Sequence, residues 1–388
     1  MNTLPSGYAE PKFKEVVEVF MHNFSKGLDV GAALCIYYKG NPVVDIWHGE
    51  AKSGVPWSNE TLVPLTSISK SVFASLILYL SQTRVFDLDI PVSEFWPAFG
   101  QNGKKKISVR CVLSHRAGIP TFDQPISLDQ QVSRNGLIEE LERKEPIWSP
   151  NAKHGYHAIT MGYLMTEMIY RLSRTVSKQF LNQKLVLPLS LDLHQTLKEE
   201  DIPRIVEMIP PPNDIRQDTP VPPELKRYRS ALLNKDSLMY RATFGSTCMT
   251  FEDMNNPLYY TAERPAIYAT ASSTAKFFAS LIGDVKGIRF FEPETVNIAR
   301  NLESQGHDMV FEMPSFWGVG FMLPGGPLWK SFGQRAFGHI GASGAVAFAD
   351  PENNLAFAFL PNKMKSVLEC TDRRVVKLIN QTYYCLKS

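Results

Sequence analysis

The feature that most constrains this chain is an apolar stretch, residues 72–80, that comes shortly after Ser67 and Lys70. The stretch is apolar on nearly all sides of a helix, which is typical of a helix buried in the middle of a protein. Residues three apart on a helix lie on one face, about one turn from each other, so Ser67 and Lys70 are expected to face one another. The rest of the chain must therefore wrap around this helix.

The serine and lysine suggest nucleophilic chemistry. A serine hydroxyl is a weak nucleophile until a base takes its proton, and a desolvated lysine can act as that base. The first backbone amides of a helix also favour negative charge nearby. The alternative is structural: Ser67 caps the helix and Lys70 is a solvated residue of its first turn. The spacing alone does not decide between the two interpretations.

Composition limits the function classes. The chain has 388 residues, 44% of them hydrophobic, which is enough for a large core. Charged residues make up 21% and the net charge is only +2, so a general nucleic-acid-binding protein is not expected. The one basic run, residues 104–106, follows a glycine and is interpreted as a solvated turn.

Cysteine usage and the N-terminus concern the compartment. The cysteines are scattered and form no CxxC pair, which predicts neither a disulfide framework nor a zinc site and suggests a reducing compartment; they are Cys35, Cys111, Cys248, Cys370 and Cys385. Residues 1–10 show no secretory signal, and their acidic residues are unlike a transit peptide. No apolar run reaches membrane-spanning length. An intracellular, cytoplasmic protein is expected, with a mitochondrial location left open.

The two ends of the chain predict strands. Residues 11–24 carry a helical apolar stripe, and strand-like runs at 30–38 and 43–49 flank a turn, which predicts a β-hairpin. In the C-terminal third, strands are expected at 316–323, 335–341, 343–349 and 355–360, followed by a closing helix at 366–386. The simplest pairing is one antiparallel sheet built from both ends, with the terminal helices on one face.

The middle of the chain predicts helices, so the fold class is α+β. We expect one domain, 1–388, with an α/β part from residues 1–65 and 285–388 and a mostly helical part from residues 66–284. Helices are expected at residues 109–115, 137–143, 159–172 and 272–283. Clustered prolines at 209–223 predict an extended surface connector. The surrounding segment, 205–266, is interpreted as a loop-rich insertion that forms a wall or lid of a pocket.

Three motifs, in this order, resemble those of the serine β-lactamase and penicillin-binding-protein superfamily, in particular its β-lactamase-related carboxylesterases and their animal relatives. Ser67-Ile68-Ser69-Lys70 matches the Ser-x-x-Lys motif at the start of a buried helix. Gly155-Tyr156-His157-Ala158 matches the tyrosine motif on a loop, and His339-Ile340-Gly341 matches the Lys-Thr-Gly or His-x-Gly motif on an edge strand. The resemblance covers about residues 30–362 and implies a β-lactamase/DD-peptidase-like fold.

The resemblance implies acyl transfer. Ser67 would attack a carbonyl and form an acyl-enzyme that water hydrolyses, and Lys70 and Tyr156 would share the work of the general base. Which of the two takes the proton stays open, although two nearby cations would favour loss of the tyrosine proton. The backbone amides of Ser67 and Ala342 would form the oxyanion hole, and such donors contribute about 3 kcal/mol each.

The third motif is expected to bind substrate. Gly341 has no side chain, so substrate can lie close along the strand, and His339 would orient the substrate or tune Tyr156. The alternatives are that Tyr156 is a buried tyrosine with a satisfied hydroxyl and that His339 is structural. No metal or organic cofactor is implied. The other histidines of this region are expected to be loop hydrogen-bonding residues; they are His115, His154 and His157.

Two departures from the superfamily bear on the substrate. Many β-lactamases and transpeptidases have Tyr-x-Asn where this chain has Ala158, and His339 replaces the lysine of Lys-Thr-Gly. Both changes remove groups that help to hold a β-lactam. The resemblance therefore implies a serine hydrolase that acts on a small-molecule ester or amide. No nucleic-acid partner and no membrane span are expected. The alternatives are a β-lactamase or peptidase of the same fold, or a weakly active scaffolding protein that forms homo-oligomers.

Overall fold

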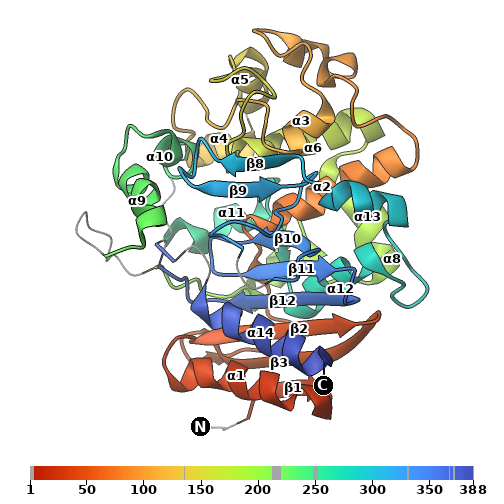
Figure 1. Ribbon diagram of the computed structural model, residues 1–388, viewed down its shortest axis with the longest axis vertical. Coiled ribbons are helices and arrows are strands. Elements are labelled where there is room, and N and C mark those ends of the chain that lie inside the picture. Colours follow the sequence, from red (N-terminus) through yellow and green to blue (C-terminus); the bar gives the residue numbers. More distant parts are fainter. Residues whose placement is uncertain are drawn as a thin grey trace.

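The fold is built on an antiparallel sheet that combines strands from both ends of the chain (Figure 1). The computed structural model describes residues 4–134, 136–211, 220–247, 252–329, 332–366, 368–369 and 372–387. The strand order is β1-β3-β2-β12-β11-β10, with β4 (Val55–Pro56) paired to β3. The strands are β1 (Ser6–Ala9), β2 (Gly31–Tyr38), β3 (Asn41–Lys52), β10 (Phe337–Ile340), β11 (Val346–Asp350) and β12 (Leu355–Pro361). The predicted joining of the two ends is confirmed where β2 pairs with β12, from Tyr38 with Leu355 to Ala32 with Pro361.

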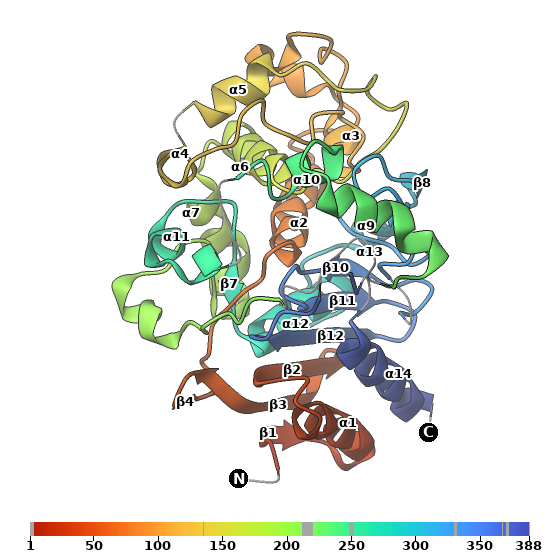
Figure 2. The ribbon, with the colours of Figure 1, turned by 90° about the vertical axis from the view of Figure 1, so that its left-hand side faces the viewer.

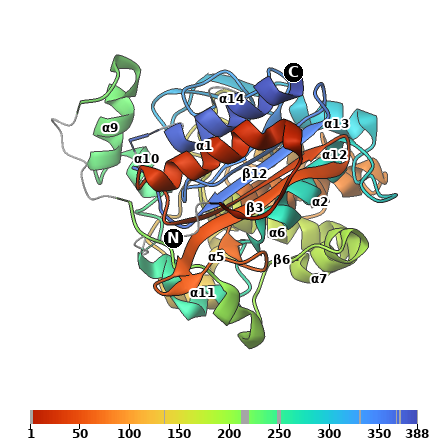
Figure 3. The same cartoon turned by 90° about the horizontal axis from the view of Figure 1, so that it is seen from below.

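Helices cover both faces of this sheet. β2 and β12 are apolar and buried along nearly their whole length, so each face needs a partner layer. On one face α1 (Lys14–Ser25) and α14 (Arg373–Lys387) lie side by side (Figure 3). On the other face α12 (Ala271–Ile282) packs against β2, β11 and β12. The expected placement of the two terminal helices on one face is therefore confirmed.

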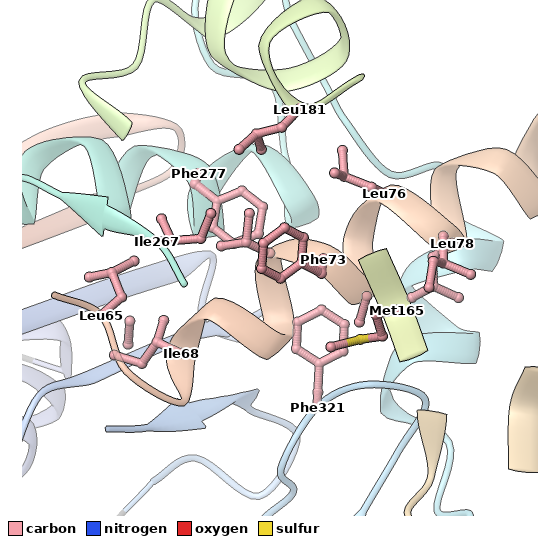
Figure 4. Close-up of a cluster of buried hydrophobic side chains, with 14 of the residues drawn as sticks. Leu65, Ile68, Phe73, Leu76, Leu78, Met165, Leu181, Ile267, Phe277 and Phe321 are labelled. Carbon is pink, nitrogen blue, oxygen red and sulfur yellow. The ribbon is translucent and has the colours of Figure 1, made fainter. Parts of the chain in front are cut away.

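The helix after Ser67, α2 (Ile68–Gln82), runs between the sheet and the helical region (Figure 2). Most of its residues are buried, as the sequence predicts. Phe73 lies at the centre of a cluster to which α6 contributes Met165 and α12 contributes Phe277 (Figure 4). Each fully buried Phe or Leu of this kind contributes about 1.5–3 kcal/mol. The nucleophile candidate is thus mounted at the start of a helix that is buried along most of its length.

The remaining elements are mostly short. The helices are α3 (Val109–Leu113), α4 (Leu128–Ser133), α5 (Leu137–Arg143), α6 (Thr160–Ser173), α7 (Ser177–Leu181), α8 (Leu187–Leu189), α9 (Lys226–Leu233), α10 (Leu238–Ala242), α11 (Pro257–Thr261) and α13 (Pro293–Arg300). Two small sheets contain β5 (Val63–Pro64), β6 (Leu193–His194) and β7 (Tyr268–Ala269), and β8 (Ser304–His307) and β9 (Pro314–Trp317). Single 3-10 or π turns occur at Pro11–Phe13, Val92–Glu94, Pro97–Gly100, Asn182–Val186, Glu199–Arg204, Pro223–Leu225 and Glu252–Asn255.

Two predicted elements at the C-terminal end are wrong in extent. The strand predicted at 316–323 ends at Trp317, in the β8–β9 hairpin. Beyond it Gly320 has φ +83°, and a Cβ there would lie 2.1 Å from the Cβ of Ala74, so the chain bends to pack closely on α2. The closing helix, predicted to begin at residue 366, begins at Arg373. The Asp372 carboxylate accepts the Arg374 amide and caps the helix there.

A further expectation needs correction. Lys104 is fully buried rather than solvated, and its Nζ donates to the carbonyls of Gln101, Glu142 and Lys144. The segment 205–266, expected to be rich in loops, holds the short helices α9, α10 and α11, which cover a minority of its residues. These helices span eight residues or fewer, too few for a clear periodicity. Most of the predicted connector, 212–219, lies outside the described residues.

The described cysteines and helices bear on the expectations about disulfides and membrane spans. Cys35 and Cys111 are free and buried, Cys385 is buried, and Cys248 and Cys370 lie outside the described residues. No helix in the described part of the chain is long and apolar enough to cross a membrane.

Candidate active site

Ser67 occupies a tight turn between β5 and α2. The preceding residue, Thr66, has φ +48°, which is rare for a β-branched residue. Hydrogen bonds on both sides hold this conformation, from the amide of Leu65 to Ile267 and from the amide of Ser69 to Thr66. Ser67 stands at the N-cap position of α2, but its hydroxyl makes no capping hydrogen bond. Such backbone strain is found at functional sites more often than elsewhere.

Two side chains converge on the hydroxyl of Ser67. The Tyr156 hydroxyl donates to Ser67 Oγ over 2.7 Å, and Lys70 Nζ lies 3.4 Å from the same oxygen. Lys70 Nζ also lies 5.1 Å from the centroid of the Tyr156 ring. Lys70 is only 8% exposed, so its interpretation as a solvated residue of the first turn is wrong. The structure thus brings together the three residues that the sequence singled out.

The protonation states of these groups follow from burial. Burial lowers the pKa of Lys70 from its ordinary 10.5 to about 7, so a large share of the lysine is a neutral amine at neutral pH. Burial raises the pKa of Tyr156. The hydrogen bond between Tyr156 and Ser67 opposes this rise, and the negative charge of Asp308 adds to it. The expectation that cations make Tyr156 readily lose its proton is therefore wrong. Tyr156 is a neutral phenol, and Lys70 is the group able to accept a proton.

Ser67 and Ala342, whose amides are expected to form the oxyanion hole, line the same cavity. Neither the amide of Ser67 nor that of Ala342 donates to an acceptor within the described residues, so both are available to a ligand. Strand β10 lies beside α2 (Figure 2). A Cβ on Gly341 would lie 2.4 Å from Thr66 Oγ1, so the glycine allows the end of β10 to approach the turn of Ser67. The close approach of Gly341 to Thr66 thus accounts for a glycine at this position, and no contact with substrate is needed to explain it.

His339 is a neutral, buried residue of the edge strand β10. Its Nδ1 lies 2.7 Å from the carbonyl of Ile340, so Nδ1 carries the ring proton. Burial and the positive charge of Lys70 lower the pKa of His339 to about 3. His339 therefore cannot replace the positive charge of the lysine found at this position in Lys-Thr-Gly. Its ring lies 5.9 Å from that of Tyr156, so it contributes to the surroundings of the tyrosine.

The other histidines hold the loop that carries Tyr156. His157 Nδ1 donates to Gly155 and its Nε2 accepts from the amide of Ile119, while its own amide donates to His115 Nδ1. They are hydrogen-bonding residues of loops, as expected. No group of three or more His, Cys, Asp or Glu within the described residues could hold a metal ion.

Ser67, Lys70 and Tyr156 lie at the wall of a cavity of about 370 Å³. Its lining is largely apolar, and as far as the chain is described it includes the basic side chains of Lys70, Arg264 and Lys365 and no acidic side chain. Segment 205–266 supplies much of the wall, including Tyr228, Leu232, Met239, Thr243, Phe244, Thr247, Met254 and Tyr259. The sequence pointed to this segment as a wall but named none of these residues, because no local motif marks them.

Comparisons with known proteins agree with this geometry. The family described as Beta-lactamase matches residues 20–381. The chain is 31% identical over 375 residues to "Esterase/beta-lactamase LipL" of Mycobacterium tuberculosis, covering 94% of this chain and 85% of that protein. A family VIII carboxylesterase has a TM-score of 0.86 and 26% identity, covering 98% and 99% of the two chains. A penicillin-binding protein homologue from Caulobacter crescentus has a TM-score of 0.84 and 28% identity, with the same coverage.

The match to the family covers more than nine-tenths of the chain, and the serine, lysine and tyrosine of the superfamily meet in one site. The chain therefore belongs to the β-lactamase family and is a serine hydrolase of the β-lactamase and penicillin-binding-protein superfamily.

Proposed function

We propose that the protein is a carboxylesterase-type hydrolase that cleaves a small ester or amide through an acyl-enzyme at Ser67. The observation that carries the proposal is the convergence of the Tyr156 hydroxyl and Lys70 Nζ on Ser67 Oγ at an apolar cavity. The relatives whose names include esterase or carboxylesterase support the same reaction class.

In the acylation half, the neutral amine of Lys70 takes the proton of Ser67 while Oγ bonds to the carbonyl carbon. The carbonyl oxygen becomes an oxyanion beside the amides of Ser67 and Ala342, which contribute about 3 kcal/mol each. The bond to the alkoxy oxygen then breaks. Tyr156 gives its proton to the departing alcohol, and the ammonium of Lys70 returns a proton to Tyr156. The products are the acyl-enzyme and a neutral alcohol.

At the start of the deacylation half, Lys70 is again a neutral amine. Water attacks the acyl carbon and passes a proton to this amine. The bond between the acyl carbon and Ser67 Oγ breaks, and Oγ recovers its proton from the ammonium of Lys70. The acid leaves and the starting state is restored. Throughout, Tyr156 acts as a phenol that donates, in keeping with its raised pKa, and Lys70 acts as the base.

The cavity favours an uncharged, apolar substrate. Its lining is mostly apolar, and neutral His339 offers no cation to a substrate carboxylate at the third motif. A β-lactam carries such a carboxylate and an amide, and Ala158 offers no side-chain amide to hold them. Hydrolysis of β-lactams or peptides is therefore the second candidate, and it is expected to be slower than ester hydrolysis.

The test compares wild type, Ser67→Ala and Ser75→Ala on 4-nitrophenyl butyrate. Ser75 is a matched control because it is a buried serine of α2 whose hydroxyl donates to the Ser71 carbonyl, within its own helix. We expect wild type and Ser75→Ala to turn over and Ser67→Ala to be inactive. Mass spectrometry after a fluorophosphonate probe should find the label on Ser67.

Three results would contradict the proposal in different ways. A wild-type protein without turnover or label would favour the scaffolding alternative, which size-exclusion chromatography then tests. Equal activity of Ser67→Ala and wild type would place the nucleophile elsewhere. Faster turnover of a chromogenic β-lactam or of a peptide panel than of the ester would favour the second candidate.

A further inference from the structure

The ring of Tyr156 stacks with two other aromatic rings. The Phe311 ring lies at a centroid distance of 4.7 Å and an interplanar angle of 20°, and the Trp317 ring lies at 5.2 Å and 9°. Both residues come from the β8–β9 hairpin, Phe311 from its turn and Trp317 from β9. The orientation of the tyrosine is therefore set by a hairpin about 150 residues further along the chain.

One buried carboxylate connects this hairpin to the backbone of Tyr156. Asp308 is 0% exposed. Its Oδ1 accepts the amides of Val310 and Phe311, each at 2.9 Å, which closes the hairpin turn. The same oxygen accepts the amide of Tyr156 at 3.1 Å. Without this carboxylate, the amide of Tyr156 and the hairpin turn would lose their common partner.

The second oxygen of Asp308 extends the connection to Trp317. Asp308 Oδ2 accepts the Ser315 hydroxyl at 2.8 Å. Since that hydroxyl has only one proton, Ser315 Oγ must accept its other bonds, from Trp317 Nε1 at 2.8 Å and from His154 Nε2 at 3.0 Å. The indole that stacks on Tyr156 is thus oriented through Ser315. One carboxylate fixes the tyrosine amide and, through the hairpin, the two rings that stack with its side chain.

We propose that Asp308 is a positioning residue of the reaction, which keeps the Tyr156 hydroxyl within hydrogen-bonding distance of Ser67 by holding the tyrosine backbone and the hairpin that clamps its ring. The inference rests on the proposed function, in which Tyr156 donates a proton. Misplacement of a reacting group by about 1 Å can cost on the order of 100-fold in rate. Asp308→Ala is therefore expected to lower kcat by about 10- to 100-fold, with little change in KM because Asp308 does not line the cavity.

The chain offers a matched control in Asp350. It is also 0% exposed, and its Oδ1 accepts the amides of Glu352 and Asn353 in the β11–β12 turn. Its Oδ2 accepts the Tyr383 hydroxyl. Among the described residues, Ser67, Lys70 and Tyr156 make no hydrogen bond to that turn. Asp350→Ala is expected to lower the thermal midpoint while leaving kcat within about twofold of wild type, since surface turns away from the site do not position reacting groups.

The experiment is a double-mutant cycle on 4-nitrophenyl butyrate with wild type, Asp308→Ala, Tyr156→Phe and the double variant. If Asp308 acts through Tyr156, its substitution lowers kcat only when the tyrosine hydroxyl is present, so the double variant equals Tyr156→Phe. Asp308→Asn is expected to recover most of kcat. Its amide oxygen keeps the three backbone donors, and its Nδ2 donates to Ser315 Oγ once His154 Nε2 accepts the serine proton.

Each outcome decides the matter. Equal losses of kcat from Asp308→Ala in both backgrounds, or no loss in wild type, would overturn the positioning role. A Tyr156→Phe protein with wild-type kcat would overturn the mechanism itself, which separates failure of the proposed function from failure of this inference. Should Asp308→Ala not fold, Ser315→Ala takes its place in the cycle, because it breaks the link to Trp317 and Ser315 does not line the cavity.

Discussion

Burial of Lys70 is expected to lower the free energy of unfolding while providing the neutral amine that hydrolysis needs. In the unfolded chain Lys70 holds its proton up to its ordinary pKa of 10.5, whereas in the folded protein burial lowers that pKa to about 7. Between these values the unfolded state binds more protons, so the free energy of unfolding rises as pH rises. At about 1.4 kcal/mol per pH unit, the penalty is about 4 kcal/mol at pH 7 and about 2 kcal/mol at pH 9.

Lys70→Met removes the titrating group and keeps a long apolar side chain. Relative to wild type, the variant is expected to be more stable by about 4 kcal/mol at pH 7 and by about 2 kcal/mol at pH 9. It is also expected to lose ester hydrolysis, because a thioether cannot take the proton of Ser67. A gain of this size is a large fraction of the free energy of unfolding of an ordinary domain, which is about 5–15 kcal/mol.

The measurement is urea unfolding of both proteins at pH 7, 8 and 9. Lys14→Met is the control, because the Lys14 side chain is 80% exposed and its substitution is expected to change stability little at any of these pH values. A stability difference between Lys70→Met and wild type that stays constant from pH 7 to pH 9 would refute the reasoning. It would mean that Lys70 does not titrate in this range and is not the neutral base.

Three further predictions concern the site and the core. Gly341→Ala should lower kcat at least about 10-fold, because its Cβ would lie 2.4 Å from Thr66 Oγ1 and disturb the turn that carries Ser67. Gly283→Ala is the control, because a Cβ there would have no atom within 4 Å, and it should leave kcat unchanged. Equal kcat values for the two variants would contradict the prediction. A choline ester should show kcat/KM at least about 10-fold below that of a neutral ester of similar size, because the described cavity wall carries basic side chains and no acidic one. Raising the salt concentration should reduce this difference in kcat/KM. A higher kcat/KM for the choline ester would contradict the prediction. Arg374→Met should lower the free energy of unfolding by about 3–5 kcal/mol without changing kcat, because it leaves the buried Asp29 carboxylate without its cation; urea unfolding and the ester assay check both parts.

The sequence predicts what depends on local spacing. Ser67 and Lys70 are three residues apart on a strongly apolar helix, so their meeting follows from helix geometry alone. The sheet follows from apolar runs near both ends that need partners on both faces. The tyrosine and histidine motifs were found by resemblance, and the structure brings Tyr156 to Ser67 and places His339 on the edge strand.

The errors concern properties that only tertiary packing creates. The pKa of Tyr156 is raised because segments from both halves of the chain bury it. Counting the cations expected near Tyr156 predicts a lowered pKa instead. The stretch 316–323 has the composition of a strand, but its glycines let it bend onto α2. Lys104 looks like a surface residue in the sequence, but it is buried, and its Nζ donates to the nearby carbonyl of Gln101 and to the distant carbonyls of Glu142 and Lys144.

The charge state of Lys70 also bears on the choice between esters and β-lactams. A substrate carboxylate bound near His339 would find Lys70 close by, since the positive charge of Lys70 already depresses the pKa of His339. A negative charge near Lys70 would stabilise its ammonium and raise its pKa above about 7, so the base would stay protonated at neutral pH. The rate with a carboxylate-bearing substrate should therefore rise with pH through a higher apparent pKa than the rate with a neutral ester. Measuring kcat against pH for 4-nitrophenyl butyrate and for a 4-nitrophenyl hemiester tests this, and identical profiles would show that Lys70 does not sense the substrate charge.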